Sequence, residues 1–155
     1  MHLEKYEVES KPDFMYFEFV SEGIQGNITK IVLYEKLPNQ ILPMFNLGFG
    51  DKDTATGLIS DMVASNNGDR NKVLATVAST VYAFVEHYPK AWIYMIGSTP
   101  VRTRLYQVGL NLYYDEIVKD FAVLGFLDDE WHKFQKNQNY NAFILTLKQN
   151  SPENI

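Results

Sequence analysis

The sequence predicts an α+β fold, built on a mixed and largely antiparallel sheet of about seven strands with two main helices. Three observations lead to this prediction. Short stretches of alternating apolar residues, separated by turn residues, dominate the first 64 residues, as in strands joined by hairpins. Two amphipathic stretches follow, with a continuous apolar run between them. Aromatic residues make up 14% of the chain, which suits a sheet with a thick core.

Several strand predictions follow the alternation of apolar and polar residues, residues 28–37 are rich in β-branched and aromatic residues, and residues 91–96 form a continuous apolar run. In the first strand Met15, Phe17 and Phe19 share one side. Proline and turn residues separate the strands, and Asp128 and Asp129 form the turn before the last segment. We predict strands at residues 14–20, 28–37, 42–49, 58–64, 91–96, 121–127 and 142–148.

The first helix follows the turn sequence Asn66–Gly68. Asp69 is its expected N-cap, since a carboxylate can accept hydrogen bonds from the free amides of the first turn. Apolar residues then recur at helical spacing from Val73 to Tyr88. Pro89 ends the helix, because the residue before a proline avoids helical backbone angles.

A second helix follows the apolar strand at residues 91–96. Ser98 or Thr99 is its expected cap, and Pro100 its first residue, where the missing N–H has no cost. Gly109 weakens this helix, and we expect Asn111 to cap a continuation through Lys119. Helix, strand and helix in succession imply a crossover connection on a sheet.

The composition indicates one domain over residues 1–155, with loose tails at residues 1–12 and 150–155. The net charge of −5 argues against nucleic-acid binding, which depends on neutralising phosphates. The chain has no cysteine, so disulfides, thiolate chemistry and cysteine zinc sites are excluded. We find no signal peptide and no membrane span, and we expect a cytoplasmic protein.

The predicted order of four strands, a helix, a strand, a helix and two strands resembles the Gcn5-related acetyltransferase fold, less its early helices. Members of that family bind the pyrophosphate of acetyl-CoA on a glycine-rich turn before a helix. The matching stretch here, Ser65–Arg70, has one glycine and places Asp69 near the phosphate position. We therefore predict no cofactor, although the resemblance implies acetyl-CoA. Arg104–Gly109 is similar to the end of the family's later helix, and this similarity implies Tyr106 as a general acid.

Two blocks are similar to a family of uncharacterised bacterial proteins of comparable length. The first block is NNGD…VLATVASTVYAF…YP, and the second is GST…RTRLYQ.G. This resemblance covers nearly the whole chain. It implies a single folded domain and brings no known activity.

The best candidate site is the strand-to-helix junction at Gly97–Arg104. Free amides, the hydroxyls of Ser98 and Thr99, and an arginine can converge there on a phosphate or a carboxylate. Arg102 and Arg104 are about 200° apart around a helix, so only one of them can face the site. In the alternative interpretation Ser98 and Thr99 are ordinary caps and the arginines pair with surface carboxylates.

A second loop carries Asn67 and Gly68, which can face the same ligand because both loops precede helices that flank one strand. The alternative is a turn followed by a helix cap. No histidine or carboxylate spacing predicts a metal site.

Two hypotheses for function follow. The first is a protein that binds a small anionic ligand. In a catalytic version of this hypothesis, the protein is a degenerate acyltransferase that uses Tyr106 as its general acid. The second is a non-enzymatic interaction module, with a protein partner or a homodimer and an exposed aromatic patch. The absence of an acid–base pair at recognisable spacing favours the second slightly.

Overall fold

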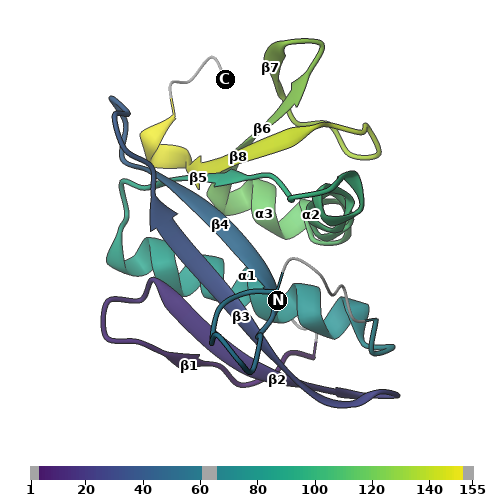
Figure 1. Ribbon diagram of the computed structural model, residues 1–155. Coiled ribbons are helices and arrows are strands. Elements are labelled where there is room, and N and C mark those ends of the chain that lie inside the picture. Colours follow the sequence, from purple (N-terminus) through teal and green to yellow (C-terminus); the bar gives the residue numbers. More distant parts are fainter. Residues whose placement is uncertain (1–3, 61–65, 152–155) are drawn as a thin grey trace. The chain divides into compact units, whose positions relative to one another are not determined.

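The computed structural model describes residues 4–60 and 66–151, and it confirms the α+β fold. Within these residues eight strands form one mixed, mostly antiparallel sheet with the order β1-β2-β3-β4-β5-β8-β6-β7, together with three α-helices (Figure 1). The elements along the chain are β1 (Glu9–Ser10), β2 (Tyr16–Gly23), β3 (Gly26–Lys36), β4 (Met44–Asp51), α1 (Arg70–His87), β5 (Trp92–Met95), α2 (Pro100–Leu112), α3 (Tyr114–Asp120), β6 (Phe121–Leu127), β7 (Glu130–Lys133), β8 (Ala142–Leu147) and the 3₁₀ helix η1 (Lys148–Asn150).

The chain divides into two compact units. The first combines the chain up to Tyr34 with Gly48–His87, and the second combines Glu35–Leu47 with the chain from Tyr88 onward. No helix in the described part of the chain is long and apolar enough to cross a membrane.

The first unit packs α1 on the β2–β3 hairpin. β2 and β3 are antiparallel, with Tyr16 opposite Leu33 and Gly23 opposite Gly26 at the turn. The ring of Tyr34 stacks on that of Phe84 with 4.1 Å between centroids, and its hydroxyl lies 2.9 Å from that of Thr80. The predicted amphipathic stripe of α1 is therefore the surface that this unit buries.

The second unit is built from the start of β4 and from β5 to β8, with α2 and α3 on the sheet (Figure 1). β4 and β5 are parallel, with Met44 opposite Trp92, as the predicted crossover requires. β5 pairs with β8, β8 with β6, and β6 with β7, all antiparallel. The side chains of Ile93 and Phe143 are completely buried at 0% exposure, so the middle of this sheet forms the core of the unit.

Several strand predictions differ from the structure. The strands predicted at residues 28–37 and 42–49 have bounds of 26–36 and 44–51. The first predicted strand begins at residue 16 rather than 14, because Phe14 has a left-handed φ of 58° and belongs to a turn. Of the predicted strand at 58–64, Ile59 forms a single bridge with Lys52, and residues 61–64 lie outside the described residues. In the predicted N-terminal tail, Glu9 and Ser10 pair with β2 as an edge strand.

The prediction that Asn111 caps a new helix is wrong. α2 continues through Gly109 to Leu112, and Tyr113 precedes α3 without a side-chain cap. The side-chain carbonyl oxygen of Asn111 instead accepts a hydrogen bond from the backbone amide of Asn137 at 3.1 Å. A tertiary contact of this side chain thus replaces the local cap that its residue type predicts.

Candidate functional site

The junction between β5 and α2 confirms the predicted helix start. Thr99 has an extended backbone (φ −137°, ψ 161°), and its hydroxyl oxygen accepts a hydrogen bond from the amide of Arg102 at 3.2 Å. Pro100 is the first helical residue. Thr99, rather than Ser98, is therefore the N-cap of α2.

The end of the strand lies directly against the first turn of α2. The hydroxyl oxygen of Thr103 accepts a hydrogen bond from the amide of Gly97 at 3.0 Å. A Cβ atom on Gly97 would lie only 2.4 Å from the backbone nitrogen of Thr103. Only glycine fits this approach, so Gly97 fixes the position of the junction relative to the helix.

Several polar groups at this junction remain open to a ligand. Among the residues that the structure describes, the amides of Ser98, Thr99 and Val101 have no hydrogen-bond partner. The side chains of Ser98 and Arg104 are exposed and make no hydrogen bond or ion pair there either. Arg102 is half-buried and has interactions of its own. The groups available to an anion are thus three amides, one hydroxyl and one guanidinium.

Tyr106, the predicted general acid, lies in the core. Its side chain is 7% exposed, and its hydroxyl donates a hydrogen bond to the backbone carbonyl of Leu47 at 3.0 Å. In this position the hydroxyl ties α2 to β4 within the second unit. The catalytic role of Tyr106 stays a prediction.

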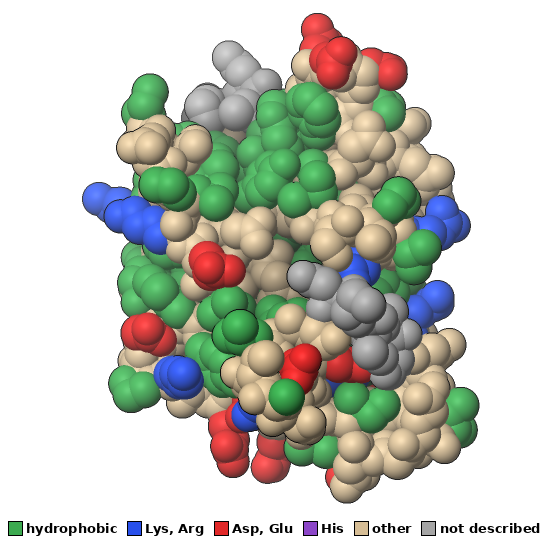
Figure 2. Space-filling view, viewed as in Figure 1, with side chains coloured by type: hydrophobic (Ala, Val, Ile, Leu, Met, Phe, Trp, Pro, Cys, Tyr) green, Lys and Arg blue, Asp and Glu red, His purple; other side chains and the backbone are tan. Residues whose placement is uncertain are grey.

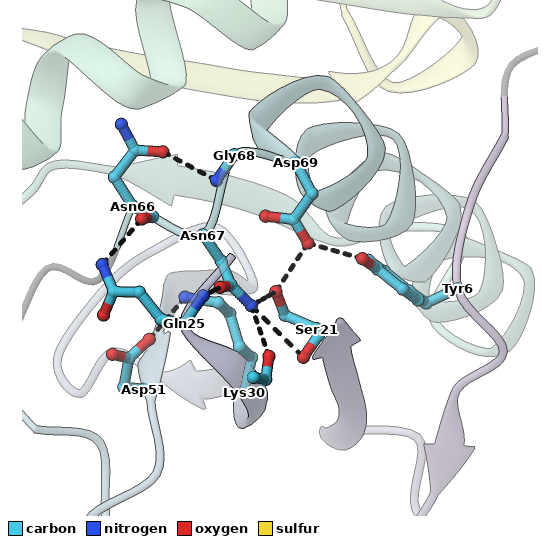
Figure 3. A network of polar contacts seen from close by, with 10 residues as sticks. Tyr6, Ser21, Gln25, Lys30, Asp51, Asn66, Asn67, Gly68 and Asp69 are labelled. Carbon is cyan, nitrogen blue, oxygen red and sulfur yellow. Dashed lines mark hydrogen bonds and ion pairs between the residues drawn. The ribbon is translucent and has the colours of Figure 1, made fainter. Parts of the chain in front are cut away.

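Asn67, predicted as a ligand-binding residue, holds the turn of the β2–β3 hairpin (Figure 3). Its side-chain carbonyl oxygen accepts a hydrogen bond from the backbone amide of Gln25 at 2.6 Å. Its amide group donates to the carbonyl of Gly26 at 2.9 Å and to the hydroxyl of Ser21 at 3.1 Å. The side chain is 2% exposed, so these contacts use its polar groups inside the protein.

The next two residues complete this loop. Gly68 has a φ of +79°, a left-handed backbone that glycine adopts readily. The carbonyl of Asp69 accepts the first helical bond of α1 from Val73, which confirms the predicted N-cap position of Asp69. Its carboxylate, however, accepts hydrogen bonds from the hydroxyls of Tyr6 and Ser21, both at 2.5 Å, rather than from the amides of the first turn. Asn67 and Gly68 belong to the first unit, whereas Ser98–Arg104 belong to the second.

A buried ion pair lies near this loop, and sequence reasoning did not identify it. Lys30 on β3 donates to Asp51 on β4 at 2.5 Å, and the two side chains are 7% and 9% exposed (Figure 3). The two residues are 21 positions apart, and no local spacing signals such a pair. In the described part of the chain no group of three or more His, Asp or Glu side chains is placed to hold a metal ion.

Tyr6 makes the stability of the first unit depend on pH in the alkaline range. Burial and the hydrogen bond to Asp69 raise the pKa of Tyr6 above its ordinary value of 10.0. The folded state therefore holds this proton more tightly than the unfolded chain. This stabilisation is complete below the unfolded pKa and is lost as the pH rises through the folded pKa.

We expect the free energy of unfolding, measured with urea, to fall as the pH rises above about 10, and to fall less steeply in a Tyr6→Phe variant. Other tyrosines, including Tyr113, also have raised pKa values and remain in both proteins. The difference between the two slopes therefore reports Tyr6 alone. Equal slopes would contradict this prediction.

Comparison with known families identifies the chain. Residues 2–148 match the model of DUF6934, described as a family of unknown function. The chain belongs to this family. The match covers most of the DUF6934 chain, in agreement with the near-complete coverage expected from the two sequence blocks. No curated protein and no solved structure matches the chain, and no link to the acetyltransferases emerges from these comparisons.

Proposed function

We propose that this DUF6934 protein binds a small ligand carrying a phosphate or a carboxylate at the junction between β5 and α2. The observation that supports this proposal most directly is the set of open amides of Ser98, Thr99 and Val101 at the start of the helix. Helix N-termini attract negative charge, because their N–H groups and the helix dipole both point toward it. The exposed hydroxyl of Ser98 adds a further donor.

An arginine supplies the positive charge in this proposal. Arg104 is exposed and lies one turn into α2, and long helical side chains extend toward the N-terminus of their helix. A guanidinium can donate two parallel hydrogen bonds to one phosphate or carboxylate. Arg102 lies on a different side of α2, so we assign the ligand contact to Arg104.

Binding is better supported than acyl transfer. The chain order of strands and helices is compatible with the acetyltransferase resemblance. However, the loop that would hold a pyrophosphate carries the Asp69 carboxylate and the fully engaged Asn67 side chain. A carboxylate near that position opposes a bound pyrophosphate. The buried, hydrogen-bonded hydroxyl of Tyr106 is also a poor proton donor to a substrate.

Thermal unfolding with inorganic phosphate, nucleotides and acetyl-CoA tests this proposal. A ligand present at about 100 times its Kd stabilises by about 2.7 kcal/mol, which raises the Tm of a chain of this size by roughly 5–10 °C. We expect Arg104→Ala to remove this shift. The matched control is Lys136→Ala, which removes one exposed positive charge elsewhere in the second unit. The proposal fails if no anion raises the Tm, or if both variants respond like the natural chain.

A second candidate function, a protein-interaction module, is favoured by an aromatic face on the sheet of the second unit. The ring of Trp131 lies 5.1 Å from that of Phe126 and 6.2 Å from that of Tyr94, and Trp131 is 39% exposed. Figure 2 shows hydrophobic side chains gathered beside the acidic β6–β7 turn. Exposed aromatic surfaces are typical of binding interfaces. A Trp131→Ser variant that keeps every assembly formed by the natural chain would contradict this candidate.

A further inference from the structure

Among the residues that the structure describes, the strand β7 ends the sheet, and no strand pairs with its outer edge. It is the last strand in the sheet order, and all four of its residues are exposed. Exposed edge strands carry unpaired N–H and C=O groups that can pair with another strand.

The β6–β7 turn determines which residues present those groups. Asp128 and Asp129 have left-handed φ values of 52° and 62°, and Leu127 pairs with Glu130 on either side of them. In such a two-residue hairpin, the residues next to the turn exchange hydrogen bonds, and every second pair does so after that. Glu130 therefore directs its backbone groups toward β6, and so does His132.

Neighbouring contacts support this assignment. The amide of Phe134 donates to the carbonyl of Val123 on β6 at 2.9 Å, so the even-numbered positions face inward. The carbonyl of Phe126 accepts from Asn141 at 2.8 Å, which places its backbone groups on the side away from β7. The N–H and C=O groups of Trp131 and Lys133 consequently point outward, at the open edge.

We propose that β7 pairs with β7 of a second copy of this chain, antiparallel about a two-fold axis that passes through Trp131. This inference rests on the interaction function proposed for the aromatic face and names its partner. Two identical antiparallel strands are related by an axis perpendicular to their sheet, and opposite residues then lie on the same face. With the axis at Trp131, each of these tryptophans exchanges both backbone hydrogen bonds with the other.

The side chains of β7 complement one another in this register. Glu130 lies opposite the partner's His132, and Lys133 lies at the partner's β6–β7 turn, which carries Asp128 and Asp129. Backbone direction also allows axes at His132 and Lys133, because Trp131 and Lys133 supply the outward-pointing groups in each case. An axis at Lys133 would place two lysines directly opposite each other, which is destabilising. An axis at His132 would place Trp131 opposite the partner's Lys133 and leave Glu130 without a basic residue opposite it. The side chains therefore favour the register about Trp131.

The same register joins the two aromatic faces. Trp131 lies on the side of the sheet that carries Phe126 and Tyr94, so pairing brings two tryptophans side by side and shields both from water. Cross-strand aromatic pairs of this kind add to the stability of a sheet. Because β7 has only four residues, the interface is small, and we expect a reversible, concentration-dependent dimer.

Sedimentation velocity over a wide range of protein concentrations tests the dimer. We expect the natural chain to convert from monomer to dimer as its concentration rises, and Trp131→Ser to remain a monomer. The matched control is Leu112→Ser, which removes another exposed hydrophobic side chain of the second unit and leaves dimerisation unchanged. Circular dichroism checks that each variant is folded.

A charge exchange tests the register. His132→Glu places a glutamate opposite the partner's Glu130 at two symmetric positions, and we expect it to weaken the dimer by about 5- to 30-fold. His132→Gln removes the ring without adding charge and should keep most of the affinity. Adding Glu130→Lys to His132→Glu restores an attractive pair and should restore the dimer.

The outcomes separate this inference from the function on which it rests. A natural chain that stays monomeric at every concentration overturns the self-pairing. If that monomer still forms complexes that Trp131→Ser abolishes, the interaction function stands and the partner is a different protein. A dimer that His132→Glu does not weaken, or that the double variant does not restore, overturns the register.

Discussion

Replacing Lys30 with methionine is expected to lower the free energy of unfolding by about 3–5 kcal/mol. Lys30 and Asp51 form an ion pair at 2.5 Å with side chains that are 7% and 9% exposed. Methionine has a similar length but no charge, so the Asp51 carboxylate would stay buried without its cation. Leaving one charge of a buried pair unpaired costs far more than the intact pair contributes. Urea unfolding followed by circular dichroism measures this loss.

The chain offers a matched control for this prediction. Lys52 forms an ion pair with Glu18 at 2.8 Å, with side chains that are 33% and 26% exposed. Because water solvates both partners, we expect Lys52→Met to have a much smaller effect. Replacing Lys30 with methionine and Asp51 with leucine together should recover most of the lost stability, since no charge is left behind. Equal losses for Lys30→Met and Lys52→Met would contradict this account.

Replacing Asn67 with alanine is expected to lower the free energy of unfolding by about 2–4 kcal/mol. Its side chain bonds the amide of Gln25, the carbonyl of Gly26 and the hydroxyl of Ser21. Because Asn67 is 2% exposed, alanine would remove all three hydrogen bonds and the packing of a buried side chain. The same urea unfolding experiment measures this effect.

Asn66 serves as the control for Asn67. It is the same residue type in the same loop, but it is exposed, and its side chain accepts one hydrogen bond from Gly68. We expect Asn66→Ala to change stability by less than about 1 kcal/mol. If Asn67→Ala has the same free energy of unfolding as the natural chain, the structural role is contradicted, and the predicted role of Asn67 in ligand binding is favoured.

The elements that could be predicted from the sequence are those with a local signal. Residues 121–127 form a strand with the expected bounds, because a short continuous apolar run between polar residues marks both ends. α1 lies between Asp69 and Pro89 as expected, because a single residue marks each end of the helix: a capping residue at the start and a proline after the end. The start of α2 was predictable for the same reason.

The features that could not be predicted depend on residues far apart in the chain. Asn67 lies in a predicted turn, but its bonds to a hairpin 42 positions earlier have no local signature. The strand β7 was missed because Glu130–Lys133 shows no apolar alternation and forms only by pairing with β6. Asn111 was misassigned because its partner Asn137 is 26 positions away.

Only part of the candidate site could be predicted, because some of its features are local and others depend on tertiary packing. Thr99, Pro100 and the helix start follow from residue preferences. The contact of Gly97 with the first turn and the burial of Tyr106 depend on how α2 packs, which residue types alone do not determine. Sequence patterns therefore indicated where an anion can bind, but not which polar groups the fold already uses.

The division of the chain into two units sets the order in which the ribosome can complete them. The β2–β3 hairpin emerges early, yet its clamps Asn67 and Asp69 follow more than 40 positions later. The contacts of the first unit can form once α1 has left the exit tunnel. Forming them carries the entropic cost of closing a long loop. Within the second unit, the segment Glu35–Leu47 is synthesised well before Trp92–Met95, the parallel strand that pairs with the start of β4. During translation this edge of β4 stays open until β5 arrives, and an open strand edge is prone to misassembly.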